Sequence, residues 1–156
     1  MDEKLLALAD KKIEQMEHYN AITSQMIYED IDGVGELIEH RQEIITSLDG
    51  ISAEMKQYVN DQSIERQAMI NKVLQSEDIN NLNGELLELQ GKIKKIASLK
   101  EQIHSNDVAA LERMKKLRDE AYEGLIRSAK NKQTINYCAP NSGGSVYNGS
   151  KLNTSN

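Results

Sequence analysis

The chain has 156 residues with a formal net charge of −6, and it contains no Trp, no Phe, one Cys and one Pro. The acidic charge argues against general affinity for nucleic acid or anionic lipid, and a lone cysteine excludes an intramolecular disulfide. No segment approaches the roughly 20 apolar residues that span a bilayer, and the acidic N-terminus does not resemble a signal peptide. We therefore expect a soluble, cytoplasmic protein with no membrane insertion.

The charges are unevenly distributed along the chain. Residues 1–91 hold 7 Lys and Arg against 19 Asp and Glu, whereas residues 92–132 hold 11 against 6. Acidic and basic helices could lie against each other, or the basic segment could receive an acidic partner. Because opposed charges also steer association, both interpretations can hold at once.

The first half of the chain predicts two helices, over residues 2–29 and 32–59, because apolar residues recur there at helical spacing. Between them the sequence EDIDGVGEL predicts a turn, in which Asp30 or Asp32 is a suitable N-cap and Gly33 eases the corner. So short a connection predicts an antiparallel hairpin.

An arginine interrupts the apolar stripe of the second helix, in the stretch LIEHRQEIITSLDGI. An arginine on a helix seam can lay its methylene groups on neighbouring leucines and pair its guanidinium with a carboxylate. A polar residue of this kind specifies register at some cost in stability. We expect Arg41 and Gln42 to fix the register of the hairpin rather than to bind a client, with Glu14 or Glu17 as the partner of Arg41.

The second half predicts helices over residues 62–104 and 107–135. The first should begin near Asp61–Ser63, and from Leu82 to Ile103 its apolar residues follow 4-3 spacing, with Lys100 at the one skipped position. The sequence Ser105-Asn106-Asp107 resembles a helix stop and restart. The apolar stripe nevertheless keeps its phase through these residues, which favours one continuous or kinked helix over a clean turn.

A continuous helix of this length would extend past the first two helices and leave an apolar strip uncovered. An uncovered strip predicts a partner helix, from a second copy of the chain or from a client protein. The candidate client-binding residues on this strip are Ala110, Met114, Leu117, Ala121 and Leu125.

These patterns predict an all-α fold, an elongated antiparallel helical hairpin or coiled-coil bundle of three or four long helices over residues 1–135. Residues 136–156 are rich in Asn, Ser and Gly and are expected to be disordered when free. Tyr137, Val146 and Tyr147 are apolar islands in this tail, and they are either incidental or docking residues.

Two segments of the sequence combine Glu and His in a pattern that could bind a metal. The sequences EQMEH (14–18) and ELIEH (36–40) place Glu and His on two neighbouring helices, where they could hold a metal. The stripes, however, turn His18 and His40 toward solvent, which favours a solvated charged face. No nucleophile and base, phosphate loop or nucleic-acid patch is indicated. We expect a non-enzymatic helical interaction protein without metal or cofactor.

The segment DIDGVGELIEHRQEIITSLDGI resembles the hallmark of FlgN-type flagellar export chaperones. In that family an acidic corner leads into a helix of the form L-(L/I)-x-x-R-Q-x-(L/I)-(L/I)-x-x-(L/I). The matching residues are Leu37, Ile38, Arg41, Gln42, Ile44, Ile45 and Leu48. The chain end, with Lys130-Asn131-Lys132, Tyr137 and the GGSVY stretch, is also similar to the family's ending, although Asn148 stands where that pattern often has Asp. FliT-type chaperones share the Arg-Gln helix.

The resemblance implies a cytoplasmic chaperone of flagellar type III export. Such a protein binds the helical termini of hook-associated proteins, prevents their premature assembly and delivers them to the export gate. The alternative is a non-catalytic coiled-coil oligomer or regulatory scaffold, such as a homodimer formed through the apolar strip. A FliT-like filament-cap chaperone is a variant within the same class.

Overall fold

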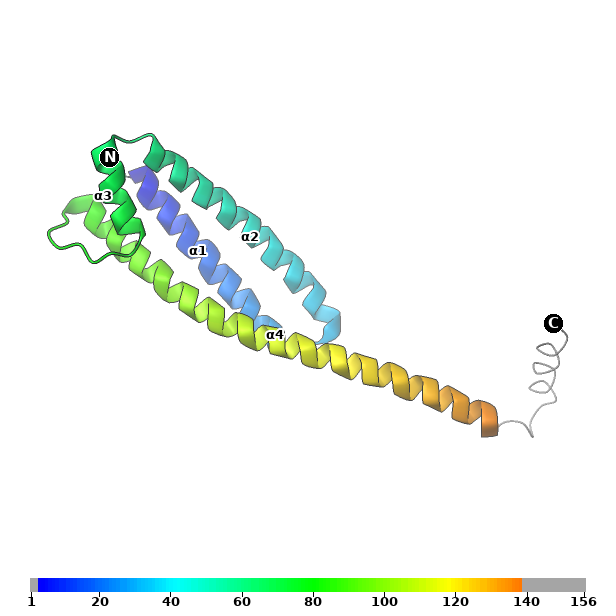
Figure 1. The fold of residues 1–156 in the computed structure, drawn as a ribbon. Helices are drawn as coiled ribbons and strands as arrows, with labels where there is room; N and C mark the ends of the chain where they lie inside the picture. The colour runs from blue at the N-terminus through cyan, green and yellow to red at the C-terminus, as the bar shows by residue number, and fades with distance from the viewer. Residues whose placement is uncertain (1–2, 139–156) are drawn as a thin grey trace. The chain divides into compact units, whose positions relative to one another are not determined.

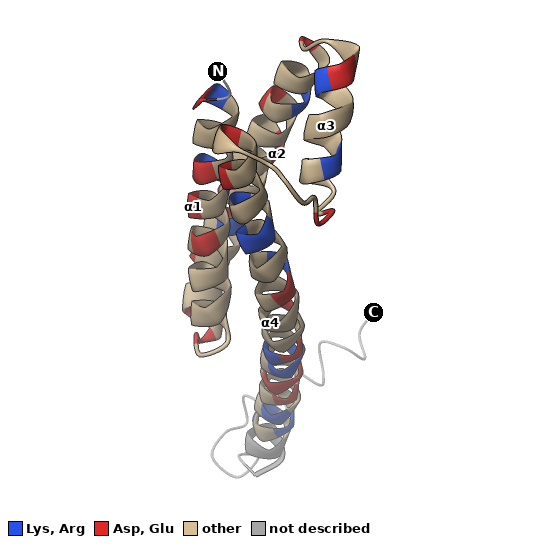
Figure 2. Cartoon of the chain, turned by 90° about the vertical axis from the view of Figure 1, so that its left-hand side faces the viewer, with Lys and Arg blue, Asp and Glu red and all other residues tan. Residues whose placement is uncertain are grey.

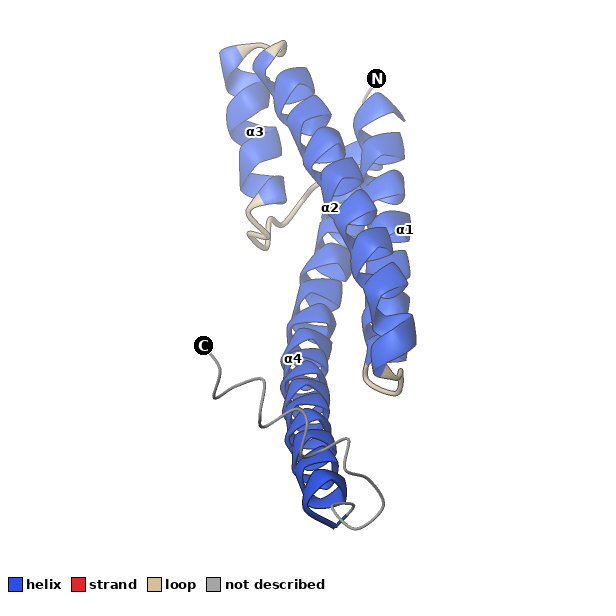
Figure 3. Cartoon of the chain, turned by 90° about the vertical axis from the view of Figure 1, so that its right-hand side faces the viewer, coloured by secondary structure: helices blue, strands red, loops and turns tan. Residues whose placement is uncertain are grey.

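The computed structural model describes residues 3–138, and these residues form four α-helices and no strand (Figures 1 and 3). The helices are α1 (Glu3–Met26), α2 (Ile31–Asn60), α3 (Ile64–Leu74) and α4 (Gly84–Cys138). The chain divides into two compact units, residues 1–114 and residues 115–156. The all-α class and the helical bundle are as the sequence predicts.

Helices α1 and α2 form the predicted antiparallel hairpin (Figure 1). Asp30 occupies the N-cap position of α2 with an extended backbone, although its side chain makes no capping hydrogen bond. α2 turns Leu37, Ile44 and Ile51 inward, and all three are buried. Their seven-residue spacing is that of a coiled-coil seam.

In the first unit, α4 runs parallel to α1. Lys92 Nζ lies 2.6 Å from Asp10 Oδ1, and Lys95 Nζ lies 2.8 Å from Glu17 Oε1, so contacts advance in the same direction along both helices. Figure 2 shows acidic and basic positions on both helices. The two ion pairs join acidic residues of α1 to basic residues of α4, as the charge distribution of the sequence favours.

The predicted single helix over residues 62–104 is wrong, because α3 ends at Leu74 and α4 begins at Gly84. Ser76, Asn81 and Gly84 have φ values of 63°, 67° and 58°, a left-handed conformation that Asn and Gly tolerate better than most residues. The run SEDINNLNG thus carries ordinary turn chemistry. The apolar 4-3 pattern continues through Ile79 and Leu82 because both pack on the core from the loop.

Of the two alternatives at Ser105–Asp107, a clean turn or a continuous helix, the continuous helix is confirmed, because α4 runs through these residues.

The predicted helix start near Asp61–Ser63 is confirmed for α3. Ser63 is the N-cap of this helix, and its Oγ accepts a hydrogen bond from the backbone N–H of Arg66.

The core of the first unit consists of two clusters. The first, which we call the four-helix end, includes Leu5, Ile70, Val73 and Leu89, none of which is exposed to solvent, and α3 contributes two of them. The second, the three-helix end, takes its buried residues from α1, α2 and α4 alone. These are Tyr19, Ile22, Met26, Leu37, Ile44 and Ala110. The short α3 therefore covers one end of the bundle and not the other.

Candidate functional site

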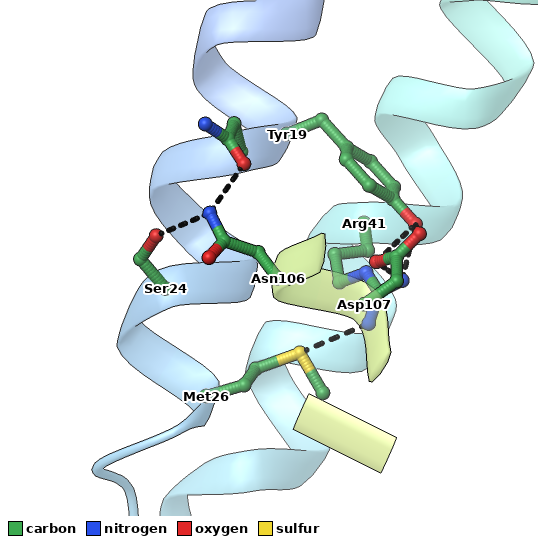
Figure 4. Close-up of polar contacts among 7 residues, drawn as sticks. Tyr19, Ser24, Met26, Arg41, Asn106 and Asp107 are labelled. Carbon is green, nitrogen blue, oxygen red and sulfur yellow. Dashed lines mark hydrogen bonds and ion pairs between the residues drawn. The ribbon is translucent and has the colours of Figure 1, made fainter. Parts of the chain in front are cut away.

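Arg41 lies at the centre of a polar cluster in the three-helix end (Figure 4). Its Nη2 donates to Asp107 Oδ1 at 2.9 Å and to the Tyr19 hydroxyl, and its Nη1 donates to Met26 Sδ at 3.3 Å. The guanidinium carbon lies 4.6 Å from the centroid of the Tyr19 ring, within range of a cation–π interaction. The cluster joins α1, α2 and α4.

The cluster confirms that Arg41 pairs with a carboxylate, but the expected partner is wrong. The carboxylate is Asp107 of α4, whereas Glu17 pairs with Lys95. Helical periodicity identifies the partners of α2 within the hairpin, but it does not show that α4 packs on the same seam. Gln42 is exposed, and its backbone carbonyl accepts a hydrogen bond from Thr46 within α2. Gln42 therefore makes no contact of this kind between helices.

The residues that resemble a helix stop serve as contacts between helices. Asn106 Nδ2 donates to Asn20 Oδ1 at 2.7 Å and to Ser24 Oγ at 3.2 Å, while Asp107 accepts from the Tyr19 hydroxyl at 3.2 Å (Figure 4). Small polar side chains are common at helix ends because they bond to the backbone. Here they bond to another helix, so the helix continues.

A groove of about 370 Å³ lies beside this cluster, and residues of α1, α2 and α4 line it. Its apolar lining comes from Met16, Tyr19, Ile45, Leu48 and Ile103. A second cavity of about 380 Å³ shares Lys12, Ser52 and Lys100 with it and extends toward the last turn of α3. The two cavities follow one face of α2, from Ile45 to Asn60, over about 22 Å.

The groove continues the face that α3 covers. Leu74 of α3 lines the second cavity together with Met55 and Val59 of α2, and Ile45 and Leu48 follow on the same face at helical spacing. α3 has only 11 residues, so it leaves the rest of this face open. The groove therefore has the place and the lining that a further helix would fill.

Sequence reasoning did not identify the groove, although one signal for it is present. Lys100 occupies the skipped position of the 4-3 seam, and in the structure this position lines the groove rather than the core. A lysine on a seam marks a place where the seam is not closed. Lys12 on α1, which follows Leu8 and precedes Met16 by four residues each, lines the same place.

The predicted client-binding strip is only partly uncovered. Ala110 is 1% exposed and belongs to the core, Met114 packs against that core, and Leu117 is buried, so the expectation that these residues are open is wrong. Ala110 and Met114 are covered because α4 packs along α1 and α2 as far as these positions. Ala121 and Leu125 in the second unit are exposed, Leu125 by 71%.

The second unit offers its own apolar side chains on α4. Tyr122 is 65% exposed and Ile126 is 39% exposed, close in sequence to Leu125. Arg127 pairs with Glu123 four residues earlier, which stabilises an exposed helix by a few tenths of a kcal/mol. The tail residues Val146 and Tyr147, and the side chain of Tyr137, lie outside the residues that the structure describes.

His18 and His40 are exposed, as the stripes predict. Within residues 3–138, no group of three or more His, Cys, Asp and Glu side chains is placed to hold a metal ion. In the same range, no helix combines the length and apolar character that crossing a bilayer requires.

Comparisons of the chain with protein-family models, with curated proteins and with solved structures gave no match.

Proposed function

We propose that this protein is a FlgN-type flagellar export chaperone that holds a helical terminus of a hook-associated protein in the groove between α2 and α4. In this proposal it acts in the cytoplasm without catalysis, keeps its client from assembling early, and delivers it to the type III export gate. The family assignment rests on the sequence resemblance around Arg41 and Gln42. The binding site rests on the groove.

The observation that carries the proposal is the uncovered half of the bundle face. α3 packs on this face at the four-helix end, and beyond it Ile45, Leu48 and Ile103 are among the apolar residues that line the groove. An amphipathic helix buries its apolar face in such a groove through residues spaced by three and four positions. A client helix would thus extend the layer that α3 begins.

A row of isoleucines on α2 supports the same site. Ile31, Ile38 and Ile45 are spaced by seven residues and are 53%, 41% and 36% exposed. Ile45 lines the groove, so the other two prolong an apolar path along the same side of α2. Exposed apolar side chains in a continuous row are typical of a binding surface rather than of a solvated face.

The test is a binding titration with fluorescent peptides that span the terminal helices of hook-associated proteins from a flagellated bacterium. Ile45→Glu places a charge in the groove and should weaken binding at least tenfold. Ile64→Glu is the matched control, because Ile64 is 85% exposed and does not line either cavity. Equal affinity for both variants, or no binding by the wild type, would refute the proposal. A filament-cap peptide that binds more tightly would favour the FliT-like variant.

Self-association is the second candidate function, and the exposed Tyr122, Leu125 and Ile126 favour it. Light scattering over a range of protein concentrations measures it directly. A dimer at low micromolar concentration that becomes monomeric in Leu125→Glu would support the oligomer. If Leu125→Glu instead leaves the mass unchanged, self-association through this residue is refuted.

A further inference from the structure

The groove is basic in a protein that is acidic overall. Lys12 and Lys100 line both the groove and the second cavity, and Lys56 lines the second cavity, whereas the chain as a whole carries a net charge of −6. Among the described residues that line them, Asp107 supplies the only carboxylate, and Arg41 and Tyr19 already bond to it. The positive charges of the groove are therefore left for a partner to neutralise.

Lys12 and Lys100 face the same space. Both line both cavities, and so does Ser52, whose hydroxyl accepts a hydrogen bond from Lys12 Nζ at 3.1 Å. Burial lowers the pKa of Lys12, and the repulsion of Lys100 lowers it further. Two like charges side by side, one of them half-buried with a neutral partner, destabilise the free protein and would be relieved by an anion.

We propose that the helix received by this groove carries an Asp or Glu side chain that binds between Lys12 and Lys100. The inference rests on the proposed function, since it names the chemistry of the helix that the groove would hold. The position of the two lysines favours a side-chain carboxylate over the carboxylate at the C-terminus of a helix. The two lysines stand where the cavities meet, and a helix that ended there would leave one of the cavities empty.

The arrangement gives the groove selectivity as well as affinity. Met16, Ile45 and Ile103 can pack against many amphipathic helices, because such contacts require only an apolar helix face. A carboxylate placed against two lysines restricts the register in which such a helix can lie. Helices with Lys or Arg at that position are rejected by repulsion.

The test is a selection from phage-displayed amphipathic helices with a fixed Leu and Met face and randomised flanking positions, using the full chain as bait. The wild type should enrich helices with Asp or Glu at one central position. Lys12→Gln combined with Lys100→Gln should lose this preference. Lys4→Gln combined with Lys11→Gln removes the same charge from α1 at exposed positions outside the two cavities, and should keep it.

The peptide that binds the wild type most tightly is then used to measure affinities. Its central Glu→Gln version should bind about tenfold more weakly to the wild type and equally well to the Lys12→Gln, Lys100→Gln protein. A Lys100→Glu protein should recover affinity for the Glu→Lys peptide. Enriched helices without an acidic preference, or equal affinities of the Glu and Gln peptides, would overturn this inference alone. If the wild type enriches no helix, the groove is not a helix site and the proposed function falls with it.

Discussion

The two ends of the bundle in the first unit are built from the same three long helices, yet they differ in what covers them. At the four-helix end, Ile70 and Val73 of α3 complete a wholly apolar core in which both are fully buried. At the three-helix end no fourth helix is present among the described residues, and Ile45 remains 36% exposed. The difference shows where the fold is complete by itself and where it is open to a partner.

The open end also uses different chemistry to hold its helices together. Arg41, Tyr19 and Asp107 join α1, α2 and α4 through directional hydrogen bonds. An apolar core alone would tolerate sliding between helices, whereas a polar cluster is satisfied in one register. A polar cluster beside an open groove can thus keep the three helices in place without a fourth layer.

The largest expected effect is a difference between the two ends in the stability that is lost when an isoleucine is replaced by alanine. Ile70→Ala should lower the free energy of unfolding by about 2–5 kcal/mol, because it leaves a void in a closed core. Ile45→Ala, the same change at the open end, should cost about 1 kcal/mol, since solvent already reaches this side chain. Urea denaturation followed by far-UV circular dichroism measures both. Similar losses for the two variants would mean that the ends are equally closed in solution.

The next effect concerns the polar cluster. Asp107→Ala should destabilise the protein by about 1–3 kcal/mol, less than a fully buried pair, because Asp107 is 36% exposed. Adding Arg41→Leu should recover most of this loss, since the unpaired guanidinium is removed as well. A double-mutant cycle on the same denaturation curves gives the coupling energy. Simple additivity of the two changes would show that the ion pair contributes nothing.

A smaller effect is expected at the loop that the sequence did not predict. Gln90 is 7% exposed, and its Nε2 donates to the backbone carbonyls of Glu77 at 3.1 Å and Ile79 at 3.5 Å. Gln90→Ala should cost about 1 kcal/mol and increase amide exchange in residues 75–83. Hydrogen exchange read by mass spectrometry detects this. Unchanged exchange would show that Ile79 and Leu82 alone hold the loop.

The smallest expected effect is a gain in stability. Lys12→Met should raise the free energy of unfolding by about 0.5–1 kcal/mol at pH 7, because a half-buried charge beside Lys100 is removed. The pKa of Lys12 is lower in the folded state than the ordinary lysine value of 10.5, so the unfolded chain holds the proton more tightly. The penalty is therefore fully present at neutral pH and disappears as the pH rises toward 10.5. Denaturation at pH 7 and pH 10.5 should show the gap between variant and wild type narrowing.

Several features were readable from the sequence because they depend on local periodicity. The helical spacing of apolar residues gave α1, α2 and their hairpin, and the solvent-facing positions of His18 and His40. The stripe that keeps its phase through Ser105–Asp107 correctly favoured a continuous helix. The break at residues 75–83 was also readable in principle, since its Ser, Asn and Asp residues are turn formers. The apolar pattern conceals this break, because Leu82 packs on the core from the loop at helical spacing.

The tertiary structure alone decided which carboxylate pairs with Arg41 and which apolar residues remain exposed to solvent. Periodicity places Arg41 on a seam but does not say which helix lies opposite, and the parallel packing of α4 on α1 brought Asp107 there. It also buried Ala110, which the sequence left exposed. The groove exists because α3 stops after 11 residues while α2 and α4 continue. Local sequence sets which face of a helix is apolar, but only the lengths and directions of its neighbours set how much of that face is covered.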